Sequence, residues 1–343
     1  MAKTNPGRFF EHYRLGQVIE HAVPRTVSGG ERALYHALYP ARHALYSSDE
    51  FARACGLPAA PLDDLAAFHL VFGKTVPDVS LNAVANLGYA EGRWHHPVMP
   101  GDTLRARSTV VGLKQTSSGG SGVVYVRTEG RNQRDDLVLD YVRWVLVRKQ
   151  DQGLPAPDPV VPDLKPALQA ADLVIPQGLD FSAYDFAQAG EPHRWGDYAV
   201  GETIDHVDGV TIEEAEHMLA TRLWQNTAKV HFDATFREDG RRLIYGGHVM
   251  SLARALSFNG LANAQMIVGL NGGAHANPCF AGTTVRAWSE VLDKAETKAP
   301  GVGAIRLRLV ATSGGAPFEL WGEDGRYLPH VLLDLDYWAL MPL

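Results

Sequence analysis

The chain has 343 residues, of which 45% are hydrophobic and 21% are charged, so it has the composition of a globular protein and a length that suits two domains. Its net charge of −7 argues against a nucleic-acid partner, because such proteins need a basic surface to displace phosphate counterions. The chain has only two cysteines, no signal-peptide core and no apolar run of about 18 residues, which predicts a soluble cytoplasmic protein without a membrane partner.

The first half of the chain predicts two helices followed by strands. GGERALYHALY has the pattern of a short helix, and PLDDLAAFHLVFG has that of a longer, more apolar one. Alternating apolar and polar residues in SGVVYVRTEGRN and VLDYVRWVLVRK predict strands. The sequence SGGSG at residues 118–122 lies at the start of the first of these strands and fits a hairpin turn.

A proline-rich connector divides the chain. Residues 149–169, KQDQGLPAPDPVVPDLKPALQ, include five prolines, which lack the backbone N–H that a helix interior or a central strand requires. This segment is therefore predicted to be extended. We expect an N-terminal domain at residues 1–150, a connector at 151–185 and a C-terminal domain at 186–343.

The second half of the chain repeats the first. TIEEAEHMLATRLW predicts the short helix, with Thr211 and Glu214 at capping-box spacing, and GHVMSLARALSFNGL predicts the longer helix. TVRAWSEVLDK and AIRLRLVATSGG predict strands. Three blocks align in order: FEHYRLGQVIEH with WGDYAVGETIDH, NAVANLGYAEGRWHHPVMPGDTL with NAQMIVGLNGGAHANPCFAGTTV, and VLDYVRWVLV with LLDLDYWALM. Each unit is predicted to be α+β, with a long helix across a curved antiparallel sheet.

Both units resemble the MaoC-like, (R)-specific enoyl-CoA hydratase family. PGDTL and its counterpart AGTTV match the turn and strand that follow the helix of that family's hot-dog fold. NPGRFFEHYRLGQ, ACGLPAAPLDDLAAFH, FGKTVPD and LNAVANLGYAEGR resemble its double hot-dog members that act on mesaconyl-C1-CoA.

This resemblance implies a tandem (double) hot-dog fold and a hydro-lyase. The expected reaction is reversible hydration of mesaconyl-C1-CoA (2-methylfumaryl-CoA) to β-methylmalyl-CoA, in a pathway of the ethylmalonyl-CoA type. The expected substrate is therefore a CoA thioester, with no cofactor and no metal. We also expect a homo-oligomer, whose state the sequence does not specify.

The stretch RLWQNTAKVHFDATF, residues 222–236, carries the candidate catalytic residues. The family motif, roughly G-D-x-N-P-x-H-x-D, places its catalytic His at His231 and its last Asp at Asp233, whereas Asn226 stands at the catalytic Asp. An amide cannot take a proton, but it can orient a water or hold a thioester oxygen. The resemblance therefore implies that His231 carries the proton transfer, with Asp233 either substituting for the missing acid or capping the next turn.

The duplication predicts a single active site in the second half. At the spacing of the first aligned block, Tyr46 corresponds to His231 and Ala41 to Asn226. The first half has thus lost these polar groups, and we expect it to support the fold and to shape the acyl pocket.

Two glycines are candidates for binding the thioester oxygen. The resemblance places Gly246 and Gly247 at the start of the hot-dog helix, where backbone N–H groups are unpaired and lie at the positive end of the helix dipole. A glycine pair can also serve only to let the helix approach the sheet.

The free carboxylate of the expected substrate calls for a cation, preferably a guanidinium. Arg42 is the first candidate and Arg222 the second, and Lys229 and Arg254 follow. Each can equally be a solvated surface charge.

Three other functions remain open. The chain could be another MaoC-like (R)-specific hydratase, a hot-dog thioesterase, or a non-catalytic acyl-CoA-binding protein, which the missing catalytic Asp keeps in consideration.

Overall fold

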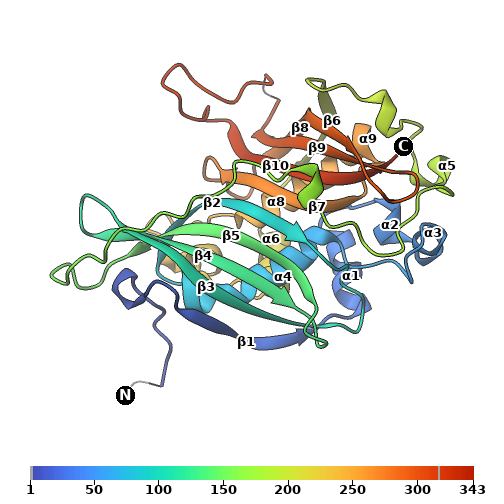
Figure 1. Ribbon diagram of the computed structural model, residues 1–343. Helices are drawn as coiled ribbons and strands as arrows, with labels where there is room; N and C mark the ends of the chain where they lie inside the picture. Colours follow the sequence, from blue (N-terminus) through green and yellow to red (C-terminus); the bar gives the residue numbers. More distant parts are fainter. Residues whose placement is uncertain (1–2, 316) are drawn as a thin grey trace.

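The computed structural model describes residues 3–315 and 317–343 and contains one curved antiparallel sheet that wraps around two long helices (Figure 1). These helices are α4 (Asp64–Thr75) and α8 (Gly246–Leu256), and they correspond to the two longer helices expected from the sequence. Helix α4 packs mainly on β3, and α8 packs on β8, β9 and β10. The α+β arrangement is thus as predicted.

The sheet consists of ten strands in the order β1-β3-β4-β5-β2-β7-β10-β9-β8-β6. Read from each outer edge, the two halves have the same order, which reproduces the sequence repeat in space. Strands β2 and β7 join the halves, with Tyr89 opposite Gly273 and Gly92 opposite Leu270. The strands are β1 (Val18–Thr26), β2 (Ala83–Trp94), β3 (Thr103–Gln115), β4 (Ser121–Arg131), β5 (Leu137–Arg148), β6 (Thr203–Thr211), β7 (Met266–His275), β8 (Thr284–Glu296), β9 (Val302–Ser313) and β10 (Val331–Pro342).

Short helices connect these elements and cover the ends of the sheet. They are α1 (Gly29–Leu38), α2 (Ala44–Ser47), α3 (Asp49–Ala54), α5 (Phe186–Ala189), α6 (Glu214–Leu223), α7 (Lys229–Phe232) and α9 (Phe258–Leu261). A π-helical turn, η2 (Val76–Ser80), follows α4, and 3₁₀ turns occur at η1 (Phe10–His12), η3 (Ala170–Asp172), η4 (Trp195–Asp197) and η5 (Ala234–Phe236).

The capping box predicted for α6 from Thr211 and Glu214 is wrong, because other residues cap this helix. Thr211 is the last residue of β6, and its hydroxyl lies 2.8 Å from that of Thr284 on β8. The N-cap is Glu213, whose backbone N–H donates to the Glu216 carboxylate over 3.0 Å. The strand continues further than the sequence pattern indicates because Thr211 still pairs in the ladder.

The two halves share one hydrophobic core. Its largest cluster contains Phe68 and Val71 of α4 together with Val249 of α8 and Leu309 of β9. Every residue of α4 is buried, including its polar ones, because the helix lies between the sheet and the second half. Neither half could therefore bury its helix alone.

The proline-rich connector runs along the outside of this core. Val160 exchanges backbone hydrogen bonds of 2.9 and 2.8 Å with Leu113 on β3, and the Leu168 N–H donates to Asn271 of β7 over 2.8 Å. Its extended form follows from the prolines. The domain boundaries at residues 150 and 186 stay a prediction.

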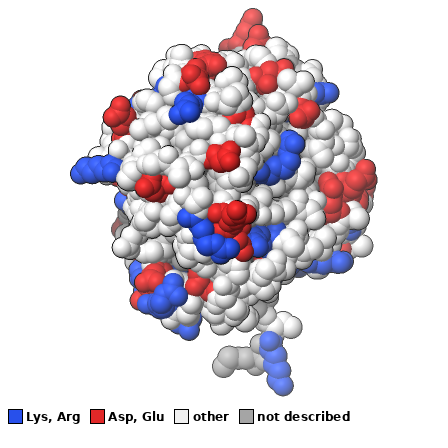
Figure 2. Space-filling model, turned by 90° about the vertical axis from the view of Figure 1, so that its right-hand side faces the viewer, with Lys and Arg blue, Asp and Glu red and all other residues white. Residues whose placement is uncertain are grey.

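Charges on the face shown in Figure 2 are mixed, with Lys and Arg side chains next to Asp and Glu rather than in a continuous basic stripe. Within the described part of the chain, no helix has both the length and the apolar character that crossing a membrane requires.

Gly73 of α4 lies at a close contact between the halves. A Cβ at this position would overlap the backbone carbonyl oxygen of Trp224, which follows α6. We predict that Gly73→Ala lowers the free energy of unfolding by about 1–3 kcal/mol or more, because overpacking here must displace backbone. Urea unfolding measures the effect.

Gly29→Ala is the matched control, since Gly29 is also helical and its Cβ would meet nothing within 4 Å. It should leave stability unchanged or raise it slightly, by less than about 1 kcal/mol. Equal unfolding midpoints for the two variants would contradict the proposed contact.

Candidate active site

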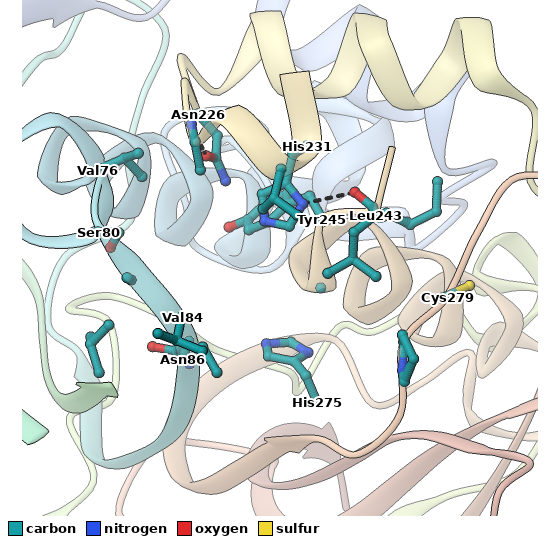
Figure 3. Close-up of a pocket in the computed structure, with 18 of the residues that line it drawn as sticks. Val76, Ser80, Val84, Asn86, Asn226, His231, Leu243, Tyr245, His275 and Cys279 are labelled. Atoms are coloured by element: carbon teal, nitrogen blue, oxygen red, sulfur yellow. Dashed lines mark hydrogen bonds between the residues drawn. The ribbon is translucent and has the colours of Figure 1, made fainter. Parts of the chain in front are cut away.

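A cavity of about 310 Å³ lies at the junction of the two halves. Figure 3 shows first-half residues such as Ser80 and Asn86 on one side, and His231 and Tyr245 of the second half on the other. The volume is within the range of small-molecule sites. Its apolar wall includes Phe72, Val76, Val84, Val145, Leu243, Val249 and Leu332.

His231 is presented to this cavity by the four-residue helix α7. Its Nδ1 lies 2.8 Å from the carbonyl oxygen of Leu243, so Nδ1 carries the proton and donates it to that carbonyl (Figure 3). Burial of the ring lowers the pKa of His231 below its ordinary value, and the hydrogen bond to Leu243 opposes this shift only in part. At pH 7 the imidazole is therefore neutral, and the lone pair of Nε2 can accept a proton.

Asn226 lies beside His231 on the same wall. Its side-chain oxygen accepts a 3.2 Å hydrogen bond from the Ala228 N–H, and its own backbone N–H donates to Thr221 over 2.9 Å. These two bonds hold the turn between α6 and α7. The oxygen is thereby engaged, and the amide NH₂ is the group that Asn226 can offer to a ligand.

Asp233 does not line the cavity, and of its two predicted roles the structure shows the capping one. Its carboxylate accepts from the backbone N–H of Thr235 over 2.9 Å and from the Thr235 hydroxyl over 2.7 Å. These hydrogen bonds lower its pKa. The side chain is exposed at the start of η5, as expected for a cap.

Gly246 and Gly247 open helix α8, and Gly246 lines the cavity. Within the described residues, neither of their backbone N–H groups has a hydrogen-bond acceptor, whereas the next N–H, of His248, donates to Tyr245 over 2.8 Å. A Cβ on Gly246 would overlap the His275 ring. The helix start thus offers free N–H donors, at its positive end, to an oxygen that gains negative charge.

Three of the four cations predicted to bind the substrate carboxylate do not line the cavity. Arg42 is exposed and lies over the Phe258 ring, 4.4 Å from its centroid, and Arg222 is exposed on α6. Arg254 is buried elsewhere and donates to Ser257 over 3.0 Å. Only Lys229 of the four reaches the cavity, where it is exposed.

Sequence reasoning missed several polar residues that line the cavity, among them Asn86, Arg143 and His275. His275 Nε2 lies 3.1 Å from the Tyr89 hydroxyl, and burial followed by the charge of His231 lowers its pKa to about 4. A signal for Arg143 was present in VLDYVRWVLV, because strand alternation places it in the inward row of apolar residues.

The first-half counterpart of His231 is part of the core. The Tyr46 hydroxyl donates to the Asp64 carboxyl group, and both side chains are buried. Burial, followed by the neighbouring Asp63, raises the pKa of Asp64 to about 8. This neutral pair has no imidazole and ties α2 to α4.

Known proteins resemble this chain over its whole length. The family model described as mesaconyl-CoA hydratase matches residues 1–314. A mesaconyl-CoA hydratase of Cereibacter sphaeroides is 79% identical over 341 residues, with 99% of each chain covered. A beta-methylmalyl-CoA dehydratase of Chloroflexus aurantiacus is 56% identical over 349 residues, again with 99% of each covered.

Solved structures show the same fold. A MaoC domain protein dehydratase from Chloroflexus aurantiacus superposes with a TM-score of 0.97 at 55% identity, covering 100% of this chain and 99% of that one. A Mycobacterium tuberculosis protein described as having a double hotdog fold superposes with a TM-score of 0.74 at 24% identity, covering 98% of both chains. These likenesses confirm the predicted double hot-dog fold.

Proposed function

The chain belongs to the mesaconyl-CoA hydratase family, and we propose that it is a hydro-lyase whose active site is the cavity at the junction of its halves. The reaction is reversible hydration of mesaconyl-C1-CoA to β-methylmalyl-CoA. The observation that carries this assignment is the neutral imidazole of His231, whose Nε2 is left available by the bond from Nδ1 to Leu243.

In the forward direction, His231 Nε2 takes a proton from water as the water oxygen bonds to the β-carbon of the substrate. The carbon–carbon π electrons move toward the thioester, and its oxygen gains negative charge. The N–H groups of Gly246 and Gly247 stabilise that charge. The α-carbon then receives the proton from His231, so that one imidazole serves as base and then as acid.

Asn226 occupies the position of a second proton-transfer group, but its amide cannot transfer a proton. Its NH₂ can donate to the oxygen of the attacking water and hold it next to Nε2. The single imidazole then carries both proton steps. We place one such site in each chain, in the second half, with the first half as its other wall. We further propose a cytoplasmic homo-oligomer.

A spectroscopic assay separates this function from its alternatives. A hydratase removes the enoyl-thioester absorbance of mesaconyl-C1-CoA without releasing free thiol. Thiol release would instead identify a thioesterase, and binding without turnover an acyl-CoA-binding protein. Faster turnover of unbranched enoyl-CoA would favour a general (R)-specific hydratase.

His231→Ala should lower kcat by at least about 10²-fold, because it removes the group that takes the water proton in this mechanism. Its circular dichroism spectrum should match that of the wild type. Tyr46→Phe is the control from the duplicated position and should keep most of the activity, since it removes only the hydroxyl that contacts Asp64. Similar losses in both variants would refute a single site in the second half.

In the pH profile of kcat/KM, His231 should cause a decrease on the acid side and none on the alkaline side. His231 must be unprotonated to accept a proton, and burial lowers its pKa below the ordinary 6.5. Activity should therefore be retained at about pH 8 and fall as Nε2 is protonated, with a midpoint below about pH 6.5. A midpoint above 6.5 would contradict this environment.

Asn226→Ala should reduce kcat by about 10- to 100-fold and change KM little, because the amide orients water more than it binds substrate. Steady-state kinetics measure both constants. The comparison variant is Asn226→Asp, which restores a proton-transfer group and should retain more activity than the alanine variant. A pure KM effect would place Asn226 in substrate binding.

A further inference from the structure

Arg143 of β5 is a fully buried cation that faces the cavity. Its Nη2 donates to the Thr75 hydroxyl over 2.7 Å, and its guanidinium lies 4.3 Å from the centroid of the Phe72 ring. Both contacts come from α4 and hold the planar group in place. Its Nε and Nη1 have no hydrogen-bond partner within the described residues.

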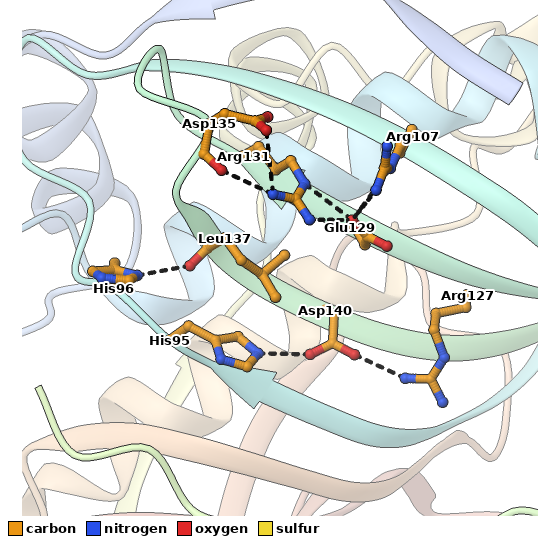
Figure 4. A network of polar contacts seen from close by, with 9 residues as sticks. All are labelled: His95, His96, Arg107, Arg127, Glu129, Arg131, Asp135, Leu137 and Asp140. Carbon is orange, nitrogen blue, oxygen red and sulfur yellow. Dashed lines mark hydrogen bonds and ion pairs between the residues drawn. The ribbon is translucent and has the colours of Figure 1, made fainter. Parts of the chain in front are cut away.

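Three arginines on the outer face of the same sheet are each paired with a carboxylate (Figure 4). Arg107 and Arg131 bind Glu129 over 2.9 and 2.8 Å, and Arg127 binds Asp140 over 2.8 Å. Arg143 forms no ion pair with any residue that the structure describes, although it is more deeply buried than these three.

The nearest candidate counterion on η2 is engaged elsewhere. The Asp78 carboxylate binds Arg8 over 2.7 Å and His21 over 2.9 Å. A guanidinium cannot escape burial by losing its proton, and a buried charge without a partner is strongly unfavourable. This arrangement indicates that a bound anionic ligand supplies the missing counterion of Arg143.

Two further polar groups beside Arg143 also lack partners. They are the Ser80 hydroxyl and the whole side-chain amide of Asn86, and both residues line the cavity. In the β2–β5 ladder, Asn86 lies opposite Val145 and Tyr89 lies opposite Arg143, so Asn86 is close to the guanidinium along the same wall. Two guanidinium N–H groups, an amide and a hydroxyl match the acceptors of a carboxylate.

We propose that Arg143, assisted by Asn86 and Ser80, binds the free carboxylate of the substrate and thereby selects dicarboxylic enoyl thioesters. This inference rests on the proposed function and specifies its substrate class. The first half holds the carboxylate on the β-carbon, and α8 of the second half holds the thioester oxygen. The double bond is thereby held between the two contacts, facing His231.

The decisive experiment compares two substrates that differ at one group. (E)-2-Methylbut-2-enoyl-CoA has a methyl group where mesaconyl-C1-CoA has its free carboxylate. Arg143→Met should lower kcat/KM for mesaconyl-C1-CoA by at least about 30-fold, because the carboxylate is left buried and unpaired. Turnover of the methyl analogue should be unchanged or improved. The ratio between the two substrates cancels general damage to the fold.

Arg148→Met is the matched control, because Arg148 lies on the same strand with an exposed side chain. It removes the same charge and should leave both substrates unaffected. Thermal unfolding adds a second criterion: Arg143→Met should be at least as stable as the wild type, since replacing an unpaired buried charge by an apolar side chain is neutral or favourable. If Arg143→Met does not fold, Arg143→Lys keeps the positive charge but lacks the planar guanidinium. It should show a smaller loss of the same selectivity.

Binding of saturated analogues tests carboxylate recognition without any chemistry. Calorimetry with 2-methylsuccinyl-C1-CoA and 2-methylbutanoyl-CoA should show tighter binding of the diacid to the wild type, and Arg143→Met should abolish that preference. Equal losses for both analogues, or no loss, would overturn the role of Arg143. A wild type that binds the diacid preferentially but does not hydrate mesaconyl-C1-CoA would instead refute the proposed function and leave this site standing.

Discussion

Helix α4 is buried along its whole length, and the rest of the molecule is arranged around that burial. Its polar side chains must find partners inside the protein, and two of them find partners in the second half. Asp64 accepts a 2.7 Å hydrogen bond from the Ile267 N–H of β7, and His69 lies 2.8 Å from the Ser251 hydroxyl of α8. Separating the halves would expose an apolar helix and leave these groups unpaired. The cavity lies at this same junction, so its geometry depends on that packing.

Duplication has allowed the two halves to differ in chemistry while they keep the same strand order. In the second half, the turn after α6 presents His231 to the cavity. In the first half, the corresponding Tyr46 is bound to the buried Asp64. The first half contributes instead through Arg143 and the end of α4, which form the opposite wall. A single cavity is thus lined by residues of both copies of the unit.

Burial acts differently on the titratable groups of the cavity. It lowers the pKa of His231 and of His275, so both imidazoles are neutral near pH 7. Arg143 supplies a guanidinium, a fixed positive charge, to the same cavity. A neutral base next to a fixed cation suits an anionic substrate: pairing with Arg143 would cancel the substrate charge that otherwise favours protonation of His231. The neutral base and the anionic substrate can then occupy the same cavity.

The sequence by itself determined the repeated unit, the long helices, several of the strands and the local placement of the candidate residues Asn226, His231 and Gly246. These features lie within one turn or one periodic segment, so their geometry follows from neighbouring residues. Only the tertiary structure decided which charged side chains reach the cavity. Arg42 is exposed, whereas Arg143 reaches the cavity. Asp233 is in the expected position, yet its side chain turns to Thr235. The reason is physical: which face of a strand or helix is buried, and opposite which distant residue, is set by register and packing between segments far apart in the chain.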